Sequence, residues 1–468
     1  MDRLLPEGFR FGVATAAFQV EGHMNGPDEP RNNWWDWERT GRVEPSGIAL
    51  DFWDGYEEHL DRAAAMGCDA FRMSIEWARC EPEEGVYDEA AFARYRQILA
   101  ACRDRGMEPL VTLHHFTHPW WLGQDLWLEG DSPARFARWV EAAVDRLADS
   151  AREWVTINEL NILALQTWLT GDFPPARWLA LDEVVRALDH LLAAHVLAYD
   201  AIKARQADSV VSTNAFTFSV YELDRLLTDV LVARAHGVER DQLGRWLAGR
   251  RADFHATVDG VIGREPIWRR WAAAKIPMER ALPATVEAVY DSPHQCTLDV
   301  AQLDHYQPSV AGHVRLPGHR TAGGRGWLPA TALWDDQPDP SLMSALFDPG
   351  TVPGRDLWIV ENGLCNRVRR GRSYPRLDGW TRPRYLRAHL REVVKMVDAG
   401  VPVTGYYHWS LVDNYEWGSY EPRFGLHGVD RERGVRWLDT DSMGNDAAGA
   451  YRRLIEGLRA GDRSVVGL

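Results

Sequence analysis

The feature that most constrains the fold of this chain is an alternation of short apolar runs with longer amphipathic segments. A short apolar run is typical of a strand buried on both faces, and an amphipathic segment is typical of a helix that covers a sheet. Repeated eight times, this unit predicts a closed (βα)8 barrel, because an open sheet usually has fewer strands. The expected strands are Phe9–Ala14, Ala70–Ser74, Pro109–His114, Glu153–Asn158, Ser209–Asn214, Val300–Tyr306, Asp356–Glu361 and Thr404–Ser410.

Helical patterns lie between these strands, at Asp54–Met66, Glu89–Arg105, Pro133–Ser150, Leu181–Arg205, Pro383–Ala399 and Ala447–Leu458. The segment Tyr221–Pro283 is too long for a plain connection after the fifth strand. It carries helical patterns at Glu222–His236, Arg240–Gly249 and near Ile267–Arg280, which predict a helical insertion over the rim of the barrel. We therefore expect residues 1–468 to form one α/β domain, a single TIM barrel with extended βα loops.

Charge and cysteine content exclude several classes of protein. The net charge of -15 argues against a nucleic-acid partner or an anionic membrane surface. The five cysteines are scattered and form no Cys-x-x-Cys motif, which is typical of reduced thiols rather than of a disulfide framework or a zinc site. The sequence shows no signal peptide and no apolar run long enough for a membrane span, so we expect a cytoplasmic protein.

Polar and aromatic side chains gather at the carboxyl ends of the expected strands, where barrels of this kind keep their active sites. The seventh strand ends in Glu361, and the fourth ends in Asn158 and Glu159. The other ends and the loops that follow them supply Gln19, Arg72, His115, Asp304, Tyr306, Trp409, Glu416 and Trp417. A barrel needs only layered aliphatic side chains inside it, so this polar ring predicts a functional site.

Glu159 and Glu361 would face each other across the mouth of such a barrel. Two facing carboxyl groups are the machinery of glycoside hydrolysis, in which one attacks the anomeric carbon and the other protonates the leaving oxygen. A separation of about 5 Å would indicate retention of configuration through a covalent glycosyl-enzyme. The proton donor must stay protonated near neutral pH, and Arg72 is a suitable cation to keep the nucleophile ionised.

The remaining polar residues suit a sugar. Those that can pair with vicinal hydroxyl groups are Gln19, His115, Asn158 and Glu416. Trp409 and Trp417 offer apolar faces for the C–H side of the ring. His114 and His115 are consecutive on a strand, so only one of them can face the mouth, which argues against a metal site there.

These motifs resemble those of the family 1 glycoside hydrolases, the β-glucosidase family, over almost the whole chain. The matching stretches are Phe11–Gly22, Phe71–Trp77, Thr112–Phe116, Thr156–Glu159, Val360–Gly363, Trp409–Trp417 and Arg423–Leu426. The resemblance implies a retaining β-glycosidase that needs no metal or cofactor, with Glu159 as acid/base and Glu361 as nucleophile.

The resemblance also implies roles for the other site residues. The group that matches the residues holding the non-reducing sugar is Gln19, His115, Asn158, Trp409, Glu416 and Trp417. Tyr306 matches the tyrosine that contacts the nucleophile, and Arg72 matches the arginine beside it. Trp334 falls where the family has an aromatic platform for the leaving group. Glu416 argues against the 6-phospho-glycosidase branch, since a carboxylate would repel a sugar phosphate.

Two departures from the family pattern carry expectations of their own. Asp304 stands where the family usually has Asn, and an extra carboxyl near Glu361 would raise the pKa of one acid. We expect Asp304 to be protonated or paired, and to narrow the pH optimum toward lower pH. The aromatic-rich segment that the family carries after strand five is unrecognisable in Tyr221–Pro283. We therefore expect an unusual leaving group, such as a small secondary metabolite rather than cellobiose.

The sequence thus predicts a retaining exo-β-glycosidase, in the first place a β-glucosidase, that acts on small-molecule β-glycosides. One alternative is a transglycosidase, which would use the same acids to pass the glycosyl group to an alcohol. Another is a sugar-binding pseudoenzyme, against which the two intact acids argue. The sequence leaves open the sugar preference among glucosides, galactosides and fucosides, and whether the chain forms a homo-oligomer.

Overall fold

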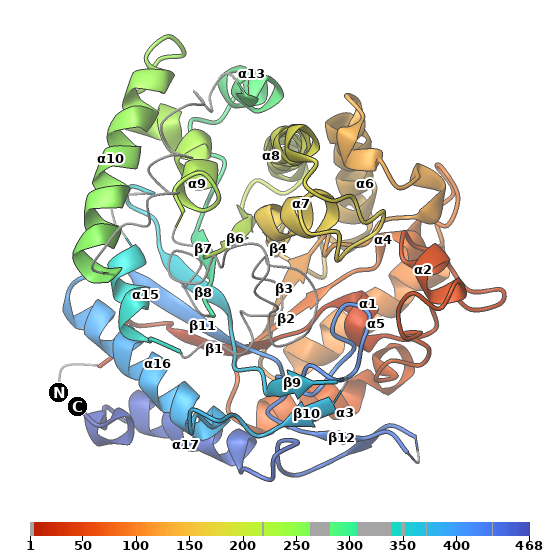
Figure 1. The fold of residues 1–468 in the computed structure, drawn as a ribbon, viewed down its shortest axis with the longest axis vertical. Coiled ribbons are helices and arrows are strands. Elements are labelled where there is room, and N and C mark those ends of the chain that lie inside the picture. The colour runs from red at the N-terminus through yellow and green to blue at the C-terminus, as the bar shows by residue number, and fades with distance from the viewer. Residues whose placement is uncertain are drawn as a thin grey trace.

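A ring of parallel strands with helices outside it forms the centre of the fold (Figure 1). The computed structural model describes residues 4–217, 220–262, 281–306, 338–347, 352–370, 372–432 and 434–468. The strands of the ring follow the order β5-β4-β3-β2-β1-β11-β8-β7-β6. Their bounds are β1 Arg10–Ala14, β2 Ala70–Ser74, β3 Glu108–Thr112, β4 Glu153–Val155, β5 Val210–Ser212, β6 Asn214–Phe216, β7 Ala301–Asp304, β8 Leu357–Asn362 and β11 Val403–Trp409.

β5 and β6 are the two halves of one interrupted strand, separated by Thr213. β5 pairs with β4 and β6 pairs with β7, both in parallel, so the two halves close the ring between them. Side-chain hydroxyls support the closing point, since Thr213 Oγ1 donates to Ile157 O at 2.7 Å and Ser212 Oγ donates to Val300 O at 2.5 Å. The (βα)8 barrel predicted from the sequence is confirmed, with its fifth strand broken where the ring closes.

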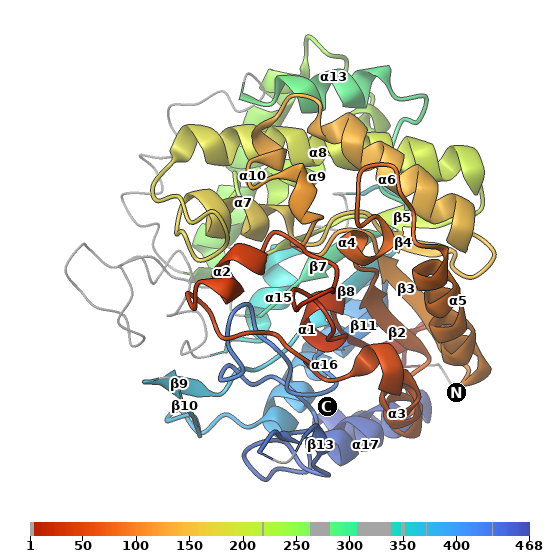
Figure 2. The same cartoon turned by 90° about the vertical axis from the view of Figure 1, so that its right-hand side faces the viewer.

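A layer of helices covers the outside of the barrel (Figures 1 and 2). Its main members are α3 Phe52–Ala65, α5 Glu89–Asp104, α6 Ser132–Leu147, α8 Leu181–Arg205, α13 Pro283–Asp291, α16 Arg382–Asp398 and α17 Ala447–Arg459. On α6, Phe136, Val140 and Leu147 are fully buried, at spacings that place them on one face of a helix. Burial of such apolar faces against the strands holds the outer layer in place.

The helical insertion after strand five lies along the flank of the barrel. α9 Arg225–Val232 and α10 Leu243–Ile262 pack on each other, and α10 also contacts α15 Ser341–Leu346 (Figure 1). The sequence predicted this insertion over the rim, whereas its described part lies beside the strands of the ring. The third predicted helix near Ile267–Arg280 lies outside the described residues, and so does Trp334.

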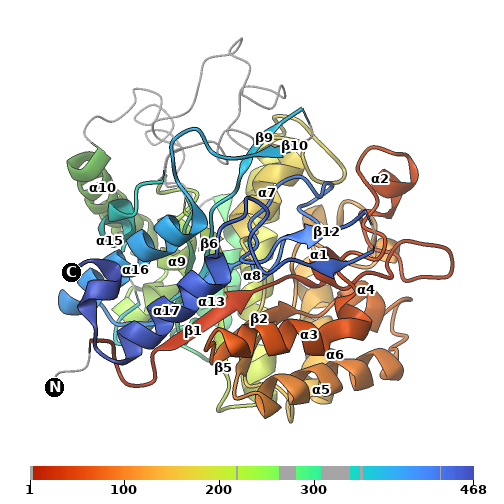
Figure 3. The ribbon, with the colours of Figure 1, turned by 90° about the horizontal axis from the view of Figure 1, so that it is seen from below.

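Loops and short elements surround the end of the barrel at which the strands finish (Figures 2 and 3). They include α1 Ala17–Val20, α2 Trp35–Arg39, α4 Trp77–Cys80, α7 Leu160–Trp168, and the hairpin of β9 Arg367–Arg369 with β10 Arg372–Tyr374. A second small antiparallel pair joins β12 Val429–Asp430 to β13 Arg436–Trp437. The five cysteines form no disulfide. In the described part of the chain, no helix combines the length and the apolar character that a membrane span requires.

Candidate active site

A cavity of about 720 Å³ opens at this end of the barrel, and the predicted site residues gather around it. Those that line it are His115, Glu159, Tyr306, Glu361, Trp409, Glu416 and Trp417. Gln19, Arg72, Asn158 and Asp304 are at most 1% exposed. Hydrogen bonds and carboxyl contacts tie these buried side chains to the lining or to its close neighbours. The structure therefore brings together all the predicted site residues that it describes, and Trp334 lies outside the described residues.

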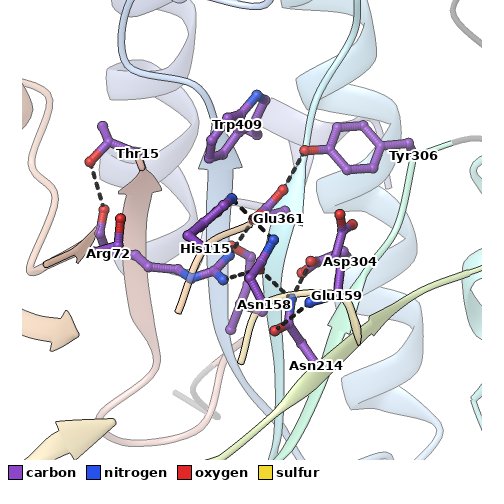
Figure 4. A network of polar contacts seen from close by, with 12 residues as sticks. Thr15, Arg72, His115, Asn158, Glu159, Asn214, Asp304, Tyr306, Glu361 and Trp409 are labelled. Carbon is purple, nitrogen blue, oxygen red and sulfur yellow. Dashed lines mark hydrogen bonds and ion pairs between the residues drawn. The ribbon is translucent and has the colours of Figure 1, made fainter. Parts of the chain in front are cut away.

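Glu361, at the end of β8, is held by a hydrogen bond at each carboxylate oxygen (Figure 4). Arg72 Nη1, from β2, donates to Oε1 at 2.5 Å, and the hydroxyl of Tyr306 donates to Oε2 at 2.7 Å. Burial raises the pKa of Glu361, while the charge of Arg72 and the bond from Tyr306 oppose that rise. Both contacts favour the ionised carboxylate and fix its orientation.

Close packing fixes the backbone that carries Glu361. A Cβ atom at Gly363 would lie 1.9 Å from the backbone oxygen of Trp409, so only glycine fits there. The amide of the intervening Asn362 donates to the hydroxyl of Tyr385 at 2.9 Å and accepts from the hydroxyl of Tyr406 at 2.7 Å. These contacts explain why the acid in this stretch is followed by an amide and a glycine.

Glu159 follows β4 and approaches the same point from another side of the ring. Its φ of 35° lies in the left-handed region, which non-glycine residues seldom adopt. Its backbone N–H donates to Asn214 Oδ1 at 3.3 Å, which supports this turn. One carboxylate oxygen from each of Glu159, Asp304 and Glu361 lies within 4.8 Å of the others. The three acids therefore form one buried cluster.

The electrostatics of this cluster separate the two acids. Burial raises the pKa of Glu159 well above its usual range, and the negative charges of Asp304 and Glu361 raise it further, against the effect of Arg72. Glu361 has two hydrogen-bond donors on its carboxylate, whereas none of the described residues donates to the carboxyl of Glu159. The arrangement favours a protonated Glu159 beside an ionised Glu361.

Three carboxyl groups at this spacing have the donor set for a cation, but the guanidinium of Arg72 already supplies positive charge there. Its two terminal nitrogens donate to Glu361 on β8 and to Asn158 after β4. Arg72 therefore offsets part of the negative charge of the cluster.

Another part of the cavity wall combines aromatic faces with hydrogen-bonding edges. Trp409 Nε1 donates to Glu416 Oε1 at 3.0 Å. The ring of His115 lies nearly parallel to those of Trp409 and Trp417, with centroids 5.9 and 5.8 Å away. Gln19 Oε1 is buried and accepts no hydrogen bond from the described residues. Such a wall suits a sugar, which presents C–H faces and hydroxyl edges.

The structure adds Asn214, which the sequence did not single out. Its Nδ2 donates to Asn158 Oδ1 at 2.9 Å and also to Asp304 Oδ2, while its Oδ1 accepts from the backbone of Glu159. It lies where the ring closes, so it joins β4 to β7 across the gap (Figure 4). Asn214 is also the last residue of the fifth predicted strand, so the polar strand end was a signal that could have found it.

Comparisons with known proteins agree with this geometry. The sequence model described as glycosyl hydrolase family 1 matches residues 1–250 and 351–442. The chain is 27% identical to "6-phospho-beta-galactosidase 1" of Streptococcus pneumoniae, over 94% of this chain and 97% of that protein. It is 27% identical to "Beta-glucosidase 6" of Oryza sativa, over 94% and 89%. A β-glucosidase structure from Thermotoga maritima, solved in complex with deoxynojirimycin, has a TM-score of 0.71 and 21% identity, over 97% of this chain and 99% of that one.

Proposed function

Because this chain belongs to glycosyl hydrolase family 1, it is a glycosidase of β-glycosidic bonds, and we propose that it is a retaining exo-β-glucosidase working as one domain over residues 1–468. Glu361 is the nucleophile and Glu159 the acid/base. The observation that carries this proposal is the spacing of the two carboxyl groups, whose oxygens approach within 4.8 Å. Retaining enzymes hold these groups about 5–5.5 Å apart, whereas inverting enzymes separate them by about 6.5–9.5 Å to admit a water molecule.

Two displacements follow from this geometry. In the first, an oxygen of Glu361 bonds to the anomeric carbon while the bond to the leaving oxygen breaks, and Glu159 gives its proton to that oxygen. In the second, Glu159 takes a proton from water, the water oxygen bonds to the anomeric carbon, and the bond to Glu361 breaks. Two inversions restore the original configuration and return both acids to their starting states.

The enclosed inner wall supports action on a terminal sugar. The side chains of Gln19 and Arg72 are fully buried behind the cavity lining, which supports a cavity that is closed on the side of the sugar. Glu416 suits a pair of hydroxyl groups. Burial raises its pKa to about 8, and neither its neutral nor its ionised form supplies the positive charge that a sugar phosphate requires. We therefore infer an unphosphorylated glucoside, although the family includes 6-phospho-β-galactosidases among the relatives of this chain.

The outer part of the cavity supports a small, partly aromatic leaving group. Ile162 and Phe173 supply apolar surface there, and Arg42 and Arg370 supply charge. Apolar side chains with a few polar groups are typical of a small-molecule pocket. We propose that the leaving group is a small secondary metabolite that contacts this outer part.

The test is release of nitrophenol from a panel of p-nitrophenyl β-glycosides by the wild type and by Glu361→Gly. The wild type should prefer the glucoside, and Glu361→Gly should lose activity on the order of 10⁴-fold, because the covalent route is closed. Added azide should restore turnover of an activated glucoside by Glu361→Gly and give the α-glucosyl azide. Equal rates for wild type and variant would overturn the assignment of Glu361. A uniformly higher rate on 6-phosphogalactosides would overturn the proposed sugar.

A further inference from the structure

Asp304 brings a third carboxyl group to the catalytic pair. It ends β7, is 0% exposed, and has an oxygen within 4.8 Å of oxygens of both Glu159 and Glu361. Arg72 is the cation that faces all three acids. Two neighbouring carboxylates that are both ionised repel each other strongly in a buried site, so such pairs tend to share a proton.

We propose that Asp304 is a positioning residue that shares one proton with Glu159 and holds that proton on the Glu159 side. This inference rests on the proposed role of Glu159 as acid/base. It assigns to Asp304 an effect on the protonation of Glu159 and no contact with the substrate.

The hydrogen bonds around the pair show which carboxyl carries the proton. Asn214 Nδ2 donates to Asp304 Oδ2, and a donor of this kind favours the ionised form of the acid that accepts it. The side chains of Glu159 and Asp304 are hydrogen-bonded to each other. Glu159 Oε1 and Asp304 Oδ1 are both buried, and no other described residue forms a hydrogen bond with either atom. Neither carboxylate can donate to the other, so a bond between them requires a proton on one of them. The donor from Asn214 assigns the charge to Asp304 and the proton to Glu159.

The groups that face the pair from neighbouring strands support the same assignment. Burial raises the pKa of Glu159 well above its usual range, and the charge of Asp304 is the next cause, followed by that of Glu361. Arg72 opposes this rise. Burial and the charge of Glu361 raise the pKa of Asp304 as well, but Arg72 and the hydrogen bonds with Glu159 and Asn214 oppose that rise and stabilise the ionised form of Asp304. Among the described residues, Tyr306 is the other titratable group that contacts Glu361, and burial raises its pKa, so it stays a neutral hydrogen-bond donor to Glu361.

The charge of the cluster also stays constant through the first displacement. Before it, Asp304 and Glu361 are ionised, Glu159 is neutral and Arg72 is positive, which leaves one net negative charge. After it, Glu361 is esterified and neutral, Glu159 has lost its proton and Asp304 is unchanged, which again leaves one. The ionised Asp304 then raises the proton affinity of Glu159 as the base for the incoming water.

This assignment reverses the direction expected from the sequence. An acid/base that stays protonated to higher pH extends the alkaline side of the pH–rate profile instead of narrowing the optimum toward lower pH. The presence of Asp304, where an amide would give the same shape without the charge, therefore favours activity into the alkaline range.

The experiment compares wild type, Asp304→Asn and the control Asp439→Asn, which removes one carboxylate charge at a fully exposed side chain. The leaving group of phenyl β-glucoside needs the proton from Glu159. For this substrate, the alkaline limb of the kcat/KM profile should shift to lower pH by about 1–2 units in Asp304→Asn and should not shift in Asp439→Asn. For 2,4-dinitrophenyl β-glucoside, whose leaving group departs without the proton, kcat/KM of Asp304→Asn at the optimum pH should differ from the wild-type value by less than about threefold, because kcat/KM reports the first displacement. An unchanged alkaline limb for phenyl β-glucoside would overturn the proposal.

A second measurement needs no activity. A buried acid whose pKa is raised on folding binds more protons in the folded state, so wild-type stability declines as pH rises through the neutral range toward the raised pKa. Asp304→Asn removes part of that decline, so its Tm relative to wild type should rise with pH, while that of Asp439→Asn should not. Parallel Tm curves for the three proteins, or an Asp304→Asn variant that does not fold, would contradict the shared proton. If the wild type hydrolyses no β-glycoside, the proposed function fails, and the Tm curves still decide about the proton.

Discussion

The inner and outer parts of the cavity are formed by different structural elements. The inner part uses buried side chains on the barrel strands, such as Arg72 and Glu361, whose positions follow from the hydrogen bonds of the ring. The outer part uses loops and the β9–β10 hairpin, with exposed charges such as Arg42 and Arg370. Strands can hold reacting groups in place within a fraction of an ångström, whereas loops tolerate sequence changes with little loss of stability. We infer that the inner part carries the chemistry and the outer part selects the leaving group.

Two arginines test this comparison with the largest expected effect. Arg72 is fully buried and bonded to Glu361, so Arg72→Met should leave the carboxylates without their cation and lower the free energy of unfolding by about 3–5 kcal/mol. Arg370→Met, at the exposed rim, should change it by less than about 0.5 kcal/mol. Urea unfolding of the two variants measures both values. Similar decreases in the free energy of unfolding for the two variants would contradict the distinction between the inner and outer parts.

Tyr306→Phe sharpens the comparison within the inner part. It removes the hydroxyl that donates to Glu361 Oε2 at 2.7 Å, a bond that lowers the pKa of Glu361. The acidic limb of kcat/KM should therefore move to higher pH, because the nucleophile ionises later, and kcat should fall by about 10–100-fold. The pH–rate profile of a β-glucoside gives both numbers. An acidic limb that stays in place would show that Tyr306 does not act on the nucleophile.

A smaller effect is expected at the sugar-binding wall. Trp409→Phe keeps an aromatic face and removes the N–H that donates to Glu416 at 3.0 Å. KM for the glucoside should rise by about five- to tenfold with a smaller change in kcat, since a ground-state contact is weakened. Steady-state kinetics on p-nitrophenyl β-glucoside measure KM and kcat separately. A decrease in kcat with unchanged KM would argue against a binding role of Trp409.

The smallest effect is expected at the rim. Arg370 lines the cavity and is exposed, so its charge can contact a leaving group. Arg370→Ala should lower kcat/KM by about threefold for an aryl glucoside with a carboxylate on the ring and leave the neutral aryl glucoside unchanged. The effect should fade at high salt, because exposed charges are screened. Equal changes in kcat/KM for both substrates would show that Arg370 does not select the leaving group.

The sequence predicted those parts of the molecule that depend on local patterns. Continuous apolar runs identified the strands, and acids at their ends identified Glu159 and Glu361, because the direction of a barrel strand determines where its last residue lies. The break at Thr213 was not predictable, since it depends on how the last pair of strands meets. The contact between Asp304 and Glu159 depends on the same closure, and so does the bridging role of Asn214. The flank position of the insertion depends on packing between helices far apart in the chain.

The central claim, that Glu361 forms a covalent bond to the sugar, is tested most directly by trapping. A 2-deoxy-2-fluoro-β-glucosyl fluoride slows the second displacement more than the first, so the glycosyl-enzyme should accumulate. Intact mass should increase by one fluoroglucosyl unit, and peptide mass spectrometry should place that unit on Glu361 within Leu357–Gly363. Label on another residue, or inactivation without any added mass, would contradict the account.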